Sequence, residues 1–409
     1  MEPNLLKEIL IVSEKAANIA RICRQDEHLL QLLTQEKSEE EKNQRFAADF
    51  KTLADVLIQE VVKQQLTTKF PSLQGNIHGE ESNVFTNTTG ESIVVQVADP
   101  ADLKSALVQI LNGDQSAAEC LIQAVYSEPS VPLSGSELEE LPYISVQEEY
   151  GVWIDPIDST AEYINGNLSC ALVLIGVFCK SDGTPVLGVV NQPFHEYLET
   201  DSSEVAGSWS GRVYWGVCRE DVRRHSEIPM QEFKRETLII AVSSSENSRI
   251  RDCLLDNGYE VLPLPGAGYK ILSVILNKCD VYLCSKPSTY VWDTLACQAI
   301  LESMTLGGSI VECRGNCEGS EGEDSRENRG GSHPESEGED LRGHGGTSSG
   351  NEGEDVRGNS GGTSSDNGEP RRLTYDRYED RCNKNGLVAY RDLDTAVRVL
   401  KQIDHLLPR

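Results

Sequence analysis

The second half of the chain alternates regularly between strand-like and helix-like runs, and this pattern limits the possible folds more than any other feature. The strand-like runs are short and rich in aliphatic and β-branched residues, at residues 237–242, 260–264, 280–285 and 309–313. The helix-like runs repeat apolar residues at helical spacing, at residues 246–256, 268–276 and 291–304. Strands separated by helices in this way predict an α/β unit.

The first half has long helical runs followed by a cluster of strands. Apolar residues recur at helical spacing over residues 5–33, 46–69 and 103–111. β-rich runs bounded by Gly, Pro or Asp follow at residues 151–154, 170–179 and 186–191. We therefore expect an N-terminal α+β half over residues 1–235 and a C-terminal α/β half that begins at residue 236.

A segment of very different composition interrupts the second half. Residues 314–372 are mostly Gly, Ser, Glu, Asp, Asn and Arg, with 14 acidic and 7 basic residues, and Gly-Glu-Asp recurs at positions 322, 338 and 353. Such a segment buries too little apolar surface to offset its ordering entropy, so we expect a disordered insertion. A neutral surface loop is favoured over a regulatory, partner-binding loop. An expected strand at 386–390 and helix at 393–407 follow, so residues 236–313 and 373–409 make up the C-terminal half.

The net charge limits the partners of the chain. Its 409 residues include 37 Lys and Arg against 66 Asp and Glu, a formal charge of −29. Nucleic acids and anionic membranes are bound mainly through Lys and Arg, so neither partner is expected. We expect no targeting signal, because the first residues lack a basic region followed by an apolar run. The sequence also has no apolar run near the roughly 18 residues of a membrane span, and its 12 cysteines have no paired spacings. We therefore expect a soluble, cytoplasmic protein with reduced thiols.

The most informative motif is Trp153-Ile154-Asp155-Pro156-Ile157-Asp158-Ser159-Thr160. An apolar strand ends there in two carboxylates, which suit a hard divalent cation together with the Ile157 carbonyl. Ser159 and Thr160 open an expected helix, whose first amides can bind an anion. Cation ligands beside an anion site are what metal-assisted phosphoryl transfer requires. The Asp-Pro-x-Asp turn alone would more often be a helix cap in a solvated turn.

Three further acidic segments can join this site. Gly79-Glu80-Glu81 places a glycine before two carboxylates, which lets the backbone approach a metal closely. Asp293 opens an apolar helix, where it can be a cap alone. Asp55 lies in a helical run between apolar residues, where it can also point to solvent. Each position has a structural alternative when taken singly, and together they favour a metal site.

In this order the acidic segments resemble the lithium-sensitive, magnesium-dependent phosphomonoesterase family that includes inositol monophosphatase, fructose 1,6-bisphosphatase and 3'(2'),5'-bisphosphate nucleotidase. The family pattern is Gly-Glu-Glu, then Trp-x-Asp-Pro-x-Asp-x-Thr, then Trp-Asp before an apolar helix, and all of it is present. The similarity covers nearly the whole chain outside the insertion, although residues 200–233 match nothing in it. It implies a layered α-β-α-β-α sandwich with the site between the two halves.

The resemblance implies two or three bound Mg²⁺ ions. One ion would be held by Glu80, Asp155 and the Ile157 carbonyl. A second would be held by Asp155, Asp158 and Asp293. Glu81 would be a further water or metal contact, and Li⁺ would inhibit by replacing one Mg²⁺.

Catalytic and substrate contacts follow from the same resemblance. Asp55 and Thr160 would orient and deprotonate the attacking water, with Glu80 as a third catalytic residue. The amides of Ser159 and Thr160 would bind the scissile phosphate. Gly266, Ala267 and Lys270 would hold the inositol ring or its second phosphate. Ser243, Ser244 and Ser245 would provide hydroxyl contacts to the substrate.

Within the family, Ser159 after Asp158 and Tyr269 before Lys270 favour an enzyme that acts on small inositol phosphates over one that acts on nucleotides. We also expect a monomer. It would remove the 1-phosphate from inositol 1,4-bisphosphate and inositol 1,3,4-trisphosphate, in inositol phosphate and phosphatidylinositol signalling. A 3'(2'),5'-bisphosphate nucleotidase with the same metal site is one alternative, and a noncatalytic acidic scaffold organised by the repeat segment is another. A dinucleotide enzyme lacks support, because the glycines at 266 and 268 have no third glycine at the required place.

Overall fold

The computed structural model describes most of the chain outside the acidic insertion. The described residues are 3–25, 30–31, 33–37, 49–129, 135–199, 207–219, 221–229, 235–313 and 370–407. Residues 1–314 and 370–409 form one compact unit. The expected disordered insertion lies outside the described residues except at 370–372. Within the described ranges, every helix is too short or too polar to cross a bilayer, and the cysteines are all free.

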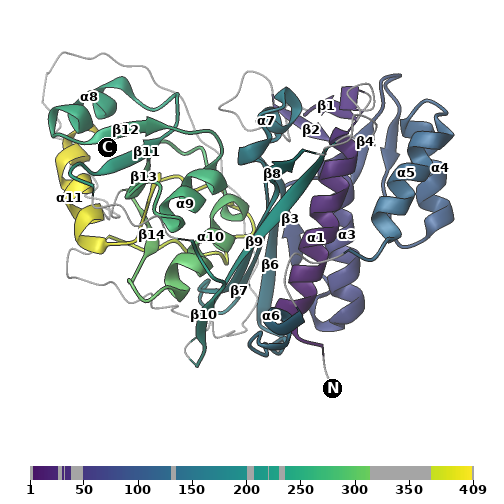
Figure 1. Ribbon diagram of the computed structural model, residues 1–409, viewed down its shortest axis with the longest axis horizontal. Coiled ribbons are helices and arrows are strands. Elements are labelled where there is room, and N and C mark those ends of the chain that lie inside the picture. The colour runs from purple at the N-terminus through teal and green to yellow at the C-terminus, as the bar shows by residue number, and fades with distance from the viewer. Residues whose placement is uncertain are drawn as a thin grey trace, which may run out of the picture. The chain divides into compact units, whose positions relative to one another are not determined.

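Layers of helices and sheets alternate through this unit in the order helix, sheet, helix, sheet, helix (Figure 1). The outer helices on the N-terminal side are α1 (Leu5–Arg24), α3 (Leu53–Lys69), α4 (Pro100–Ile110) and α5 (Gln115–Tyr126). The middle helices are α9 (Ala267–Ile275) and α10 (Val291–Ser303). The outer helices on the C-terminal side are α8 (Ser248–Asp256) and α11 (Leu393–Ile403). This layering confirms the expected fold class.

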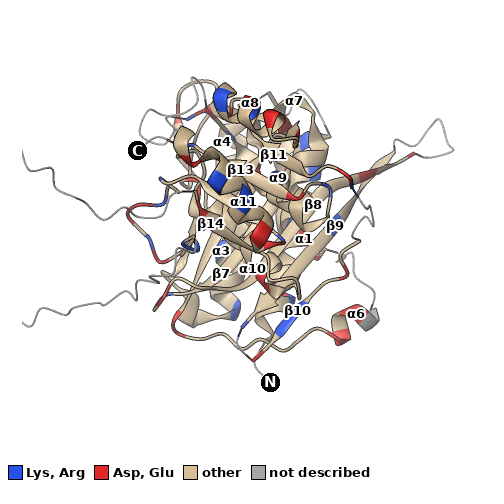
Figure 2. Cartoon of the chain, turned by 90° about the vertical axis from the view of Figure 1, so that its left-hand side faces the viewer, with Lys and Arg blue, Asp and Glu red and all other residues tan. Residues whose placement is uncertain are grey.

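The first sheet has the strand order β10-β9-β8-β7-β6-β3, and its neighbours are antiparallel except for the parallel pair β3 and β6. Its strands are β3 (Ile77–Gly79), β6 (Tyr150–Asp158), β7 (Leu172–Cys179), β8 (Pro185–Leu198), β9 (Ser208–Cys218) and β10 (Arg223–His225). All nine residues of β6 are buried, because helices cover both faces of the sheet. The pairing of β8 with β9 continues to Leu198 and Ser208, past the end of β7 (Figure 2).

The second sheet has the order β12-β11-β13-β15-β14. Its strands are β11 (Ile239–Val242), β12 (Glu260–Pro263), β13 (Val281–Cys284), β14 (Ser309–Glu312) and β15 (Leu387–Tyr390). β11 runs parallel to β12 and β13, whereas β15 runs antiparallel to β13 and β14. The chain between β14 and β15 includes the insertion, so the insertion connects two neighbouring strands at one edge of the sheet. On its return, Arg372 forms a bridge with Val311.

Short elements complete the described fold. Residues before α3 form the small pair β1 (Thr34–Glu36) and β2 (Phe50–Thr52), and β4 (Val84–Thr86) pairs with β5 (Ser92–Val94). The short helices are η1 (Pro71–Leu73), α6 (Gly135–Glu139), α7 (Thr160–Asn165), η2 (Leu168–Cys170) and η3 (Asp404–Leu406). The helix expected over 46–69 begins only at Leu53, because the Thr52 hydroxyl caps it.

Strand β7 shows how one sheet serves two apolar cores. Val173 and Ile175 pack in the core with α1 and α3, while Leu172 and Leu174 pack in the core with α9 and α10. Successive side chains of a strand point to opposite faces, which produces this division. A third core, which includes Val388 of β15, lies between the second sheet and helices α8 and α11. Each Leu or Val that is fully buried in these cores stabilises the fold by about 1.5–3 kcal/mol.

A row of glycines allows α10 to lie directly on the first sheet. Gly176, Gly188 and Gly216 are register partners on β7, β8 and β9. A Cβ atom at Gly188 would lie 2.0 Å from the carbonyl oxygen of Ala296 on α10, a distance that excludes any side chain. The close contact fixes α10 against the sheet and with it Asp293 in the first turn of the helix.

Gly188→Ala is expected to destabilise the protein by about 3 kcal/mol, because the added methyl group must push α10 away from the sheet. Urea denaturation followed by circular dichroism measures this loss. Gly75→Ala is the control, since a Cβ atom at Gly75 meets nothing within 4 Å and only the positive φ of +78° opposes it. That strain costs about 1–2 kcal/mol. Equal losses in the two variants would show that the contact with α10 is not tight.

Candidate functional site

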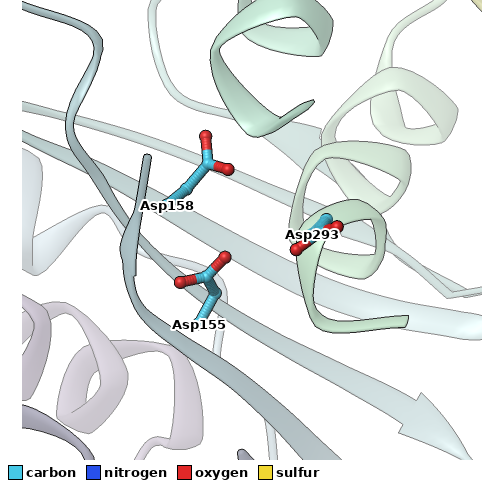
Figure 3. Close-up of side chains that lie close together, drawn as sticks. All are labelled: Asp155, Asp158 and Asp293. Carbon is cyan, nitrogen blue, oxygen red and sulfur yellow. The ribbon is translucent and has the colours of Figure 1, made fainter. Parts of the chain in front are cut away.

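Three carboxylates converge where β6 meets the first turn of α10. Asp155 and Asp158 come from β6 and Asp293 comes from α10 (Figure 3). One oxygen of each lies within 4.8 Å of one oxygen of the other two. Residues three apart on a regular strand would face opposite sides of the sheet. The pairing of β6 with β7 shifts register between Asp155 and Asp158, and this irregularity brings both carboxylates to the same side.

The environment of Asp155 fits a bound cation. Its side chain is 1% exposed, and its Oδ1 has no hydrogen-bond partner among the described residues. A buried carboxylate oxygen without a donor is unfavourable, so such an atom indicates a ligand that the protein itself does not supply. The oxygen ligands available beside Asp155 are the carboxylates of Asp158 and Asp293 and the carbonyl of Ile157. An all-oxygen set of this kind suits a hard divalent cation.

Asp55 and Asp293 each hold the start of a helix. Each is the third residue of its helix, α3 or α10. The Asp293 Oδ2 accepts a hydrogen bond of 2.8 Å from the Tyr290 amide, and the Asp55 Oδ2 accepts bonds of 2.7 Å from the amide and the hydroxyl of Thr52. The cap expected as an alternative for Asp293 therefore exists, and it leaves the other oxygen for the cluster. Asp55 is only 1% exposed, so the alternative that it points to solvent is wrong.

Lys37 is a site residue that no sequence pattern indicated. Its side chain is 3% exposed, and its Nζ lies 2.5 Å from Glu80 Oε1 and 2.6 Å from Glu81 Oε1. Asp49 lies farther away, at 3.8 Å. Burial lowers the pKa of Lys37, but the three carboxylates outweigh it and raise that pKa. The chain thus supplies its own cation for the two glutamates.

Lys37→Met is expected to lower the free energy of unfolding by about 3 kcal/mol in the absence of divalent cations. The substitution keeps the length of the side chain but leaves two carboxylates without their buried partner. Denaturant unfolding in EDTA measures the change. Lys104→Met is the matched control, because Lys104 pairs with Glu119 on the surface, where such a pair contributes less than about 1 kcal/mol. Similar losses in both variants would contradict a role for Lys37 in the site.

Burial and mutual repulsion disfavour the charged forms of the clustered carboxyl groups. For Asp155 and Asp293, desolvation is the largest cause and neighbouring carboxylates add to it, so both pKa values lie well above the ordinary range. Burial also raises the pKa of Asp55 to about 7 and that of Glu81 to about 8. When the ionisation of clustered carboxyl groups is this unfavourable, a cation bound among them stabilises their charged forms.

Asp158 differs because it faces the start of α9. Its Oδ2 accepts a hydrogen bond of 3.2 Å from the Tyr269 amide. Burial raises the pKa of Asp158, but only to about 6, because Lys270 and the amides of Tyr269 and Gly268 favour the charged form. Asp158 therefore connects the carboxylate cluster to the helix that carries the expected substrate contacts.

Gly266 permits this close approach of α9. Its φ is +63°, and a Cβ atom there would lie 2.1 Å from Ser159 Oγ and 2.8 Å from Asp158 Oδ2. Only glycine satisfies both the backbone conformation and the space. Ser159 itself has a φ of +74° and lies between β6 and α7, with its Oγ buried and without a hydrogen-bond partner in the described part of the chain.

A cavity of about 950 Å³ brings nearly all the predicted site residues together. The predicted residues that line it are Glu80, Glu81, Asp155, Ile157, Asp158, Ser159, Thr160, Ser243, Ser244, Ser245, Gly266, Ala267, Lys270 and Asp293. Asp55 is absent from this lining. The Thr160 hydroxyl donates to the Ile157 carbonyl at 3.0 Å, whereas Asp55 is bonded to Thr52, so the two residues expected to activate a water are each engaged elsewhere.

The sequence as a whole identifies the family. The model of the inositol monophosphatase family matches residues 109–341, more than half of the chain. The chain belongs to this family. Among the family's curated members, inositol polyphosphate 1-phosphatase of Mus musculus is 42% identical over 340 residues, which cover 76% of this chain and 83% of the relative. The Homo sapiens protein of the same name is 39% identical over 343 residues, with coverage of 76% and 84%.

Other members of the inositol monophosphatase family are more distant. The 3'(2'),5'-bisphosphate nucleotidase 1 of Homo sapiens is 32% identical over 275 residues, which cover 66% of this chain and 73% of the relative. Among solved structures, an IMPase from Thermotoga maritima superposes with a TM-score of 0.50 at 11% identity, over 98% of this chain and 99% of that one. The structural likeness supports the family fold.

Proposed function

We propose that the protein acts as an inositol polyphosphate 1-phosphatase, a hydrolase of phosphoric monoesters that requires Mg²⁺. Its substrates would be inositol 1,4-bisphosphate and inositol 1,3,4-trisphosphate, which lose the 1-phosphate. The carboxylate cluster of Asp155, Asp158 and Asp293 in a large cavity is the observation that carries this proposal. The choice of substrate is supported by 42% identity to the mouse 1-phosphatase, against 32% to the human nucleotidase.

Two groups of oxygen donors would hold the cations. Glu80, Asp155 and the Ile157 carbonyl form the first group, with Glu81 beside it. Asp155, Asp158 and Asp293 form the second. Bound Mg²⁺ would neutralise charge on the phosphate and make a nearby water more acidic, and Li⁺ would inhibit by taking the place of one ion. The unpartnered Asp155 Oδ1 supports this assignment, since Asp155 belongs to both groups.

The remaining residues would bind and orient the reactants. Thr160 lines the cavity and, together with Asp55, would orient and deprotonate the attacking water, with Glu80 as a third catalytic residue. The amides of Ser159 and Thr160 would bind the scissile phosphate. Gly266, Ala267 and Lys270 would hold the inositol ring or its second phosphate. Ser243, Ser244 and Ser245 would contact the substrate through their hydroxyls.

Phosphate release from a panel of substrates tests the proposal. The panel contains inositol 1,4-bisphosphate, inositol 1,3,4-trisphosphate and 3'-phosphoadenosine 5'-phosphate, each with Mg²⁺, with EDTA and with added Li⁺. We expect Mg²⁺-dependent, Li⁺-sensitive release from the inositol phosphates. Preference for the nucleotide would favour a nucleotidase instead, and no release from any substrate would favour a noncatalytic acidic protein. We further propose a monomeric, cytoplasmic enzyme, which gel filtration and cell fractionation test.

A further inference from the structure

Basic side chains are scarce in the cavity. Among the described residues that line it, acidic groups outnumber basic ones, and Lys270 and Arg381 are the two basic residues. The Lys270 side chain is 4% exposed, donates to the Leu264 carbonyl at 3.2 Å and lies over the Tyr282 ring at 5.2 Å. Arg381, in contrast, is exposed. A substrate that carries a phosphate beyond the one at the carboxylates needs a basic group of this accessible kind.

Arg381 is anchored beside both elements that carry the carboxylate cluster. Its carbonyl accepts a hydrogen bond of 3.0 Å from the amide of Val291, the first residue of α10. Its guanidinium carbon lies 5.4 Å from the centre of the Trp153 ring, two residues before Asp155 on β6. The ring centres of Trp153 on β6 and Trp292 on α10 lie 6.0 Å apart, so the strand and the helix are in contact close to Arg381.

The guanidinium is held in place without an acidic partner. It lies over the Trp153 ring, and its Nε donates to the Tyr378 carbonyl at 3.0 Å. No carboxylate of the described chain lies within ion-pair distance of Arg381. Arg381 lines the cavity, and its two terminal nitrogens have no hydrogen-bond partner among the described residues, so they are available as a planar fork that matches two oxygens of a phosphate. Holding the fork in advance reduces the entropy lost on binding.

We propose that Arg381 binds a second phosphate group of the substrate and so sets the preference for substrates with more than one phosphate. The inference rests on the proposed phosphatase function and adds a specificity residue to it. For inositol 1,4-bisphosphate, the phosphate at Arg381 would be the one that remains in the product, inositol 4-phosphate. A guanidinium fork distinguishes a phosphate from a hydroxyl, because it provides two charge-assisted hydrogen bonds to the first.

Product inhibition separates the two phosphate positions. Inositol 4-phosphate carries only the distal phosphate, whereas inorganic phosphate occupies the position of the scissile one. In Arg381→Gln we expect the inhibition constant of inositol 4-phosphate and the KM of inositol 1,4-bisphosphate to rise about 10- to 100-fold. The inhibition constant of inorganic phosphate should stay within about twofold, and Arg381→Lys should give an intermediate value because it keeps the charge and loses the fork.

Lys384→Gln is the matched control for charge. Lys384 lies three residues from Arg381, pairs with Asp380 on the surface and does not line the cavity. It should leave all three constants unchanged. The fold of Arg381→Gln is checked by its melting temperature, which should shift by no more than about 2 °C, as for a surface substitution.

Two results would overturn the inference: an unchanged constant for inositol 4-phosphate, or an equal weakening of both inhibitors, which would indicate a general disturbance of the site. Failure of wild-type protein to hydrolyse any bisphosphate would instead contradict the proposed function. Calorimetric titration of wild type and Arg381→Gln with inositol 1,4-bisphosphate and with 3'-phosphoadenosine 5'-phosphate still decides the role of Arg381 in that case. Equal affinities of the two proteins for both ligands would reject it.

Discussion

Asp155→Asn should lower Mg²⁺-dependent phosphate release by about 10³-fold or more, a barrier increase of about 4 kcal/mol. Asp155 belongs to both proposed cation groups, and its buried Oδ1 has no partner in the described part of the protein. The amide has the same shape as the carboxyl group but lacks its charge. The expected loss is therefore one of cation binding, measured as kcat over a wide range of Mg²⁺ concentrations.

A second measurement distinguishes this loss from misfolding. In EDTA, Asp155→Asn should be at least as stable as the wild type, because it removes one of several buried carboxylates that oppose ionisation. Added Mg²⁺ should then raise the melting temperature of the wild type much more than that of the variant. Asp102→Asn, at an exposed position on α4, is the control and should keep full activity. Undiminished Mg²⁺-dependent turnover in Asp155→Asn would refute the proposed site.

The metal-free protein should lose several kcal/mol of stability as the pH rises from about 4 to about 8. Burial raises the pKa of Asp158 to about 6, that of Asp55 to about 7 and that of Glu81 to about 8. The ordinary values are 3.8 for Asp and 4.5 for Glu. The folded state therefore binds more protons than the unfolded state in this window. The stability that these groups contribute is complete below their ordinary pKa values and disappears as the pH rises through the raised ones.

Urea unfolding at pH 5 and pH 8 in EDTA measures this dependence. Asp55→Asn provides the matched comparison, because it removes one of the titrating groups and should flatten the difference between the two pH values. Saturating Mg²⁺ should restore stability at pH 8 more than at pH 5, since cations compete with protons for the carboxylates. The contrary result is a wild-type protein in EDTA that loses no more stability between pH 5 and pH 8 than Asp55→Asn does. It would show that burial does not destabilise the charged forms of these carboxyl groups.

Much of the fold could be predicted because its elements carry clear local patterns. The helix expected over 291–304 is α10 at Val291–Ser303, and the strand expected over 280–285 is β13 at Val281–Cys284. Strand direction could not be predicted in the same way. β15 runs antiparallel to both of its neighbours, and the spacing of apolar residues is the same for either direction.

The strands and site residues that escaped prediction depend on contacts distant in the sequence. β9 was missed because its outer end is only partly buried, so its apolar residues do not alternate over the full length. Lys37 stands in an acidic run that is typical of a solvated surface, and only the fold brings it to Glu80 and Glu81. Arg381 reaches the cavity because its main chain is bonded to the start of α10. Local sequence carries no sign of either placement.

Two aspartates of the site, Asp55 and Asp293, also serve as the first-turn acceptors of α3 and α10. Two requirements therefore restrict the residues accepted at these positions. One is the proposed role in the site, and the other is the hydrogen bond that starts the helix. A longer Glu keeps the charge but moves the acceptor, and an Asn keeps the acceptor but loses the charge. A descendant of this protein that abandoned catalysis would still be under pressure to retain an acceptor, Asp or Asn, at both positions, so the presence of these acceptors alone does not certify an active enzyme.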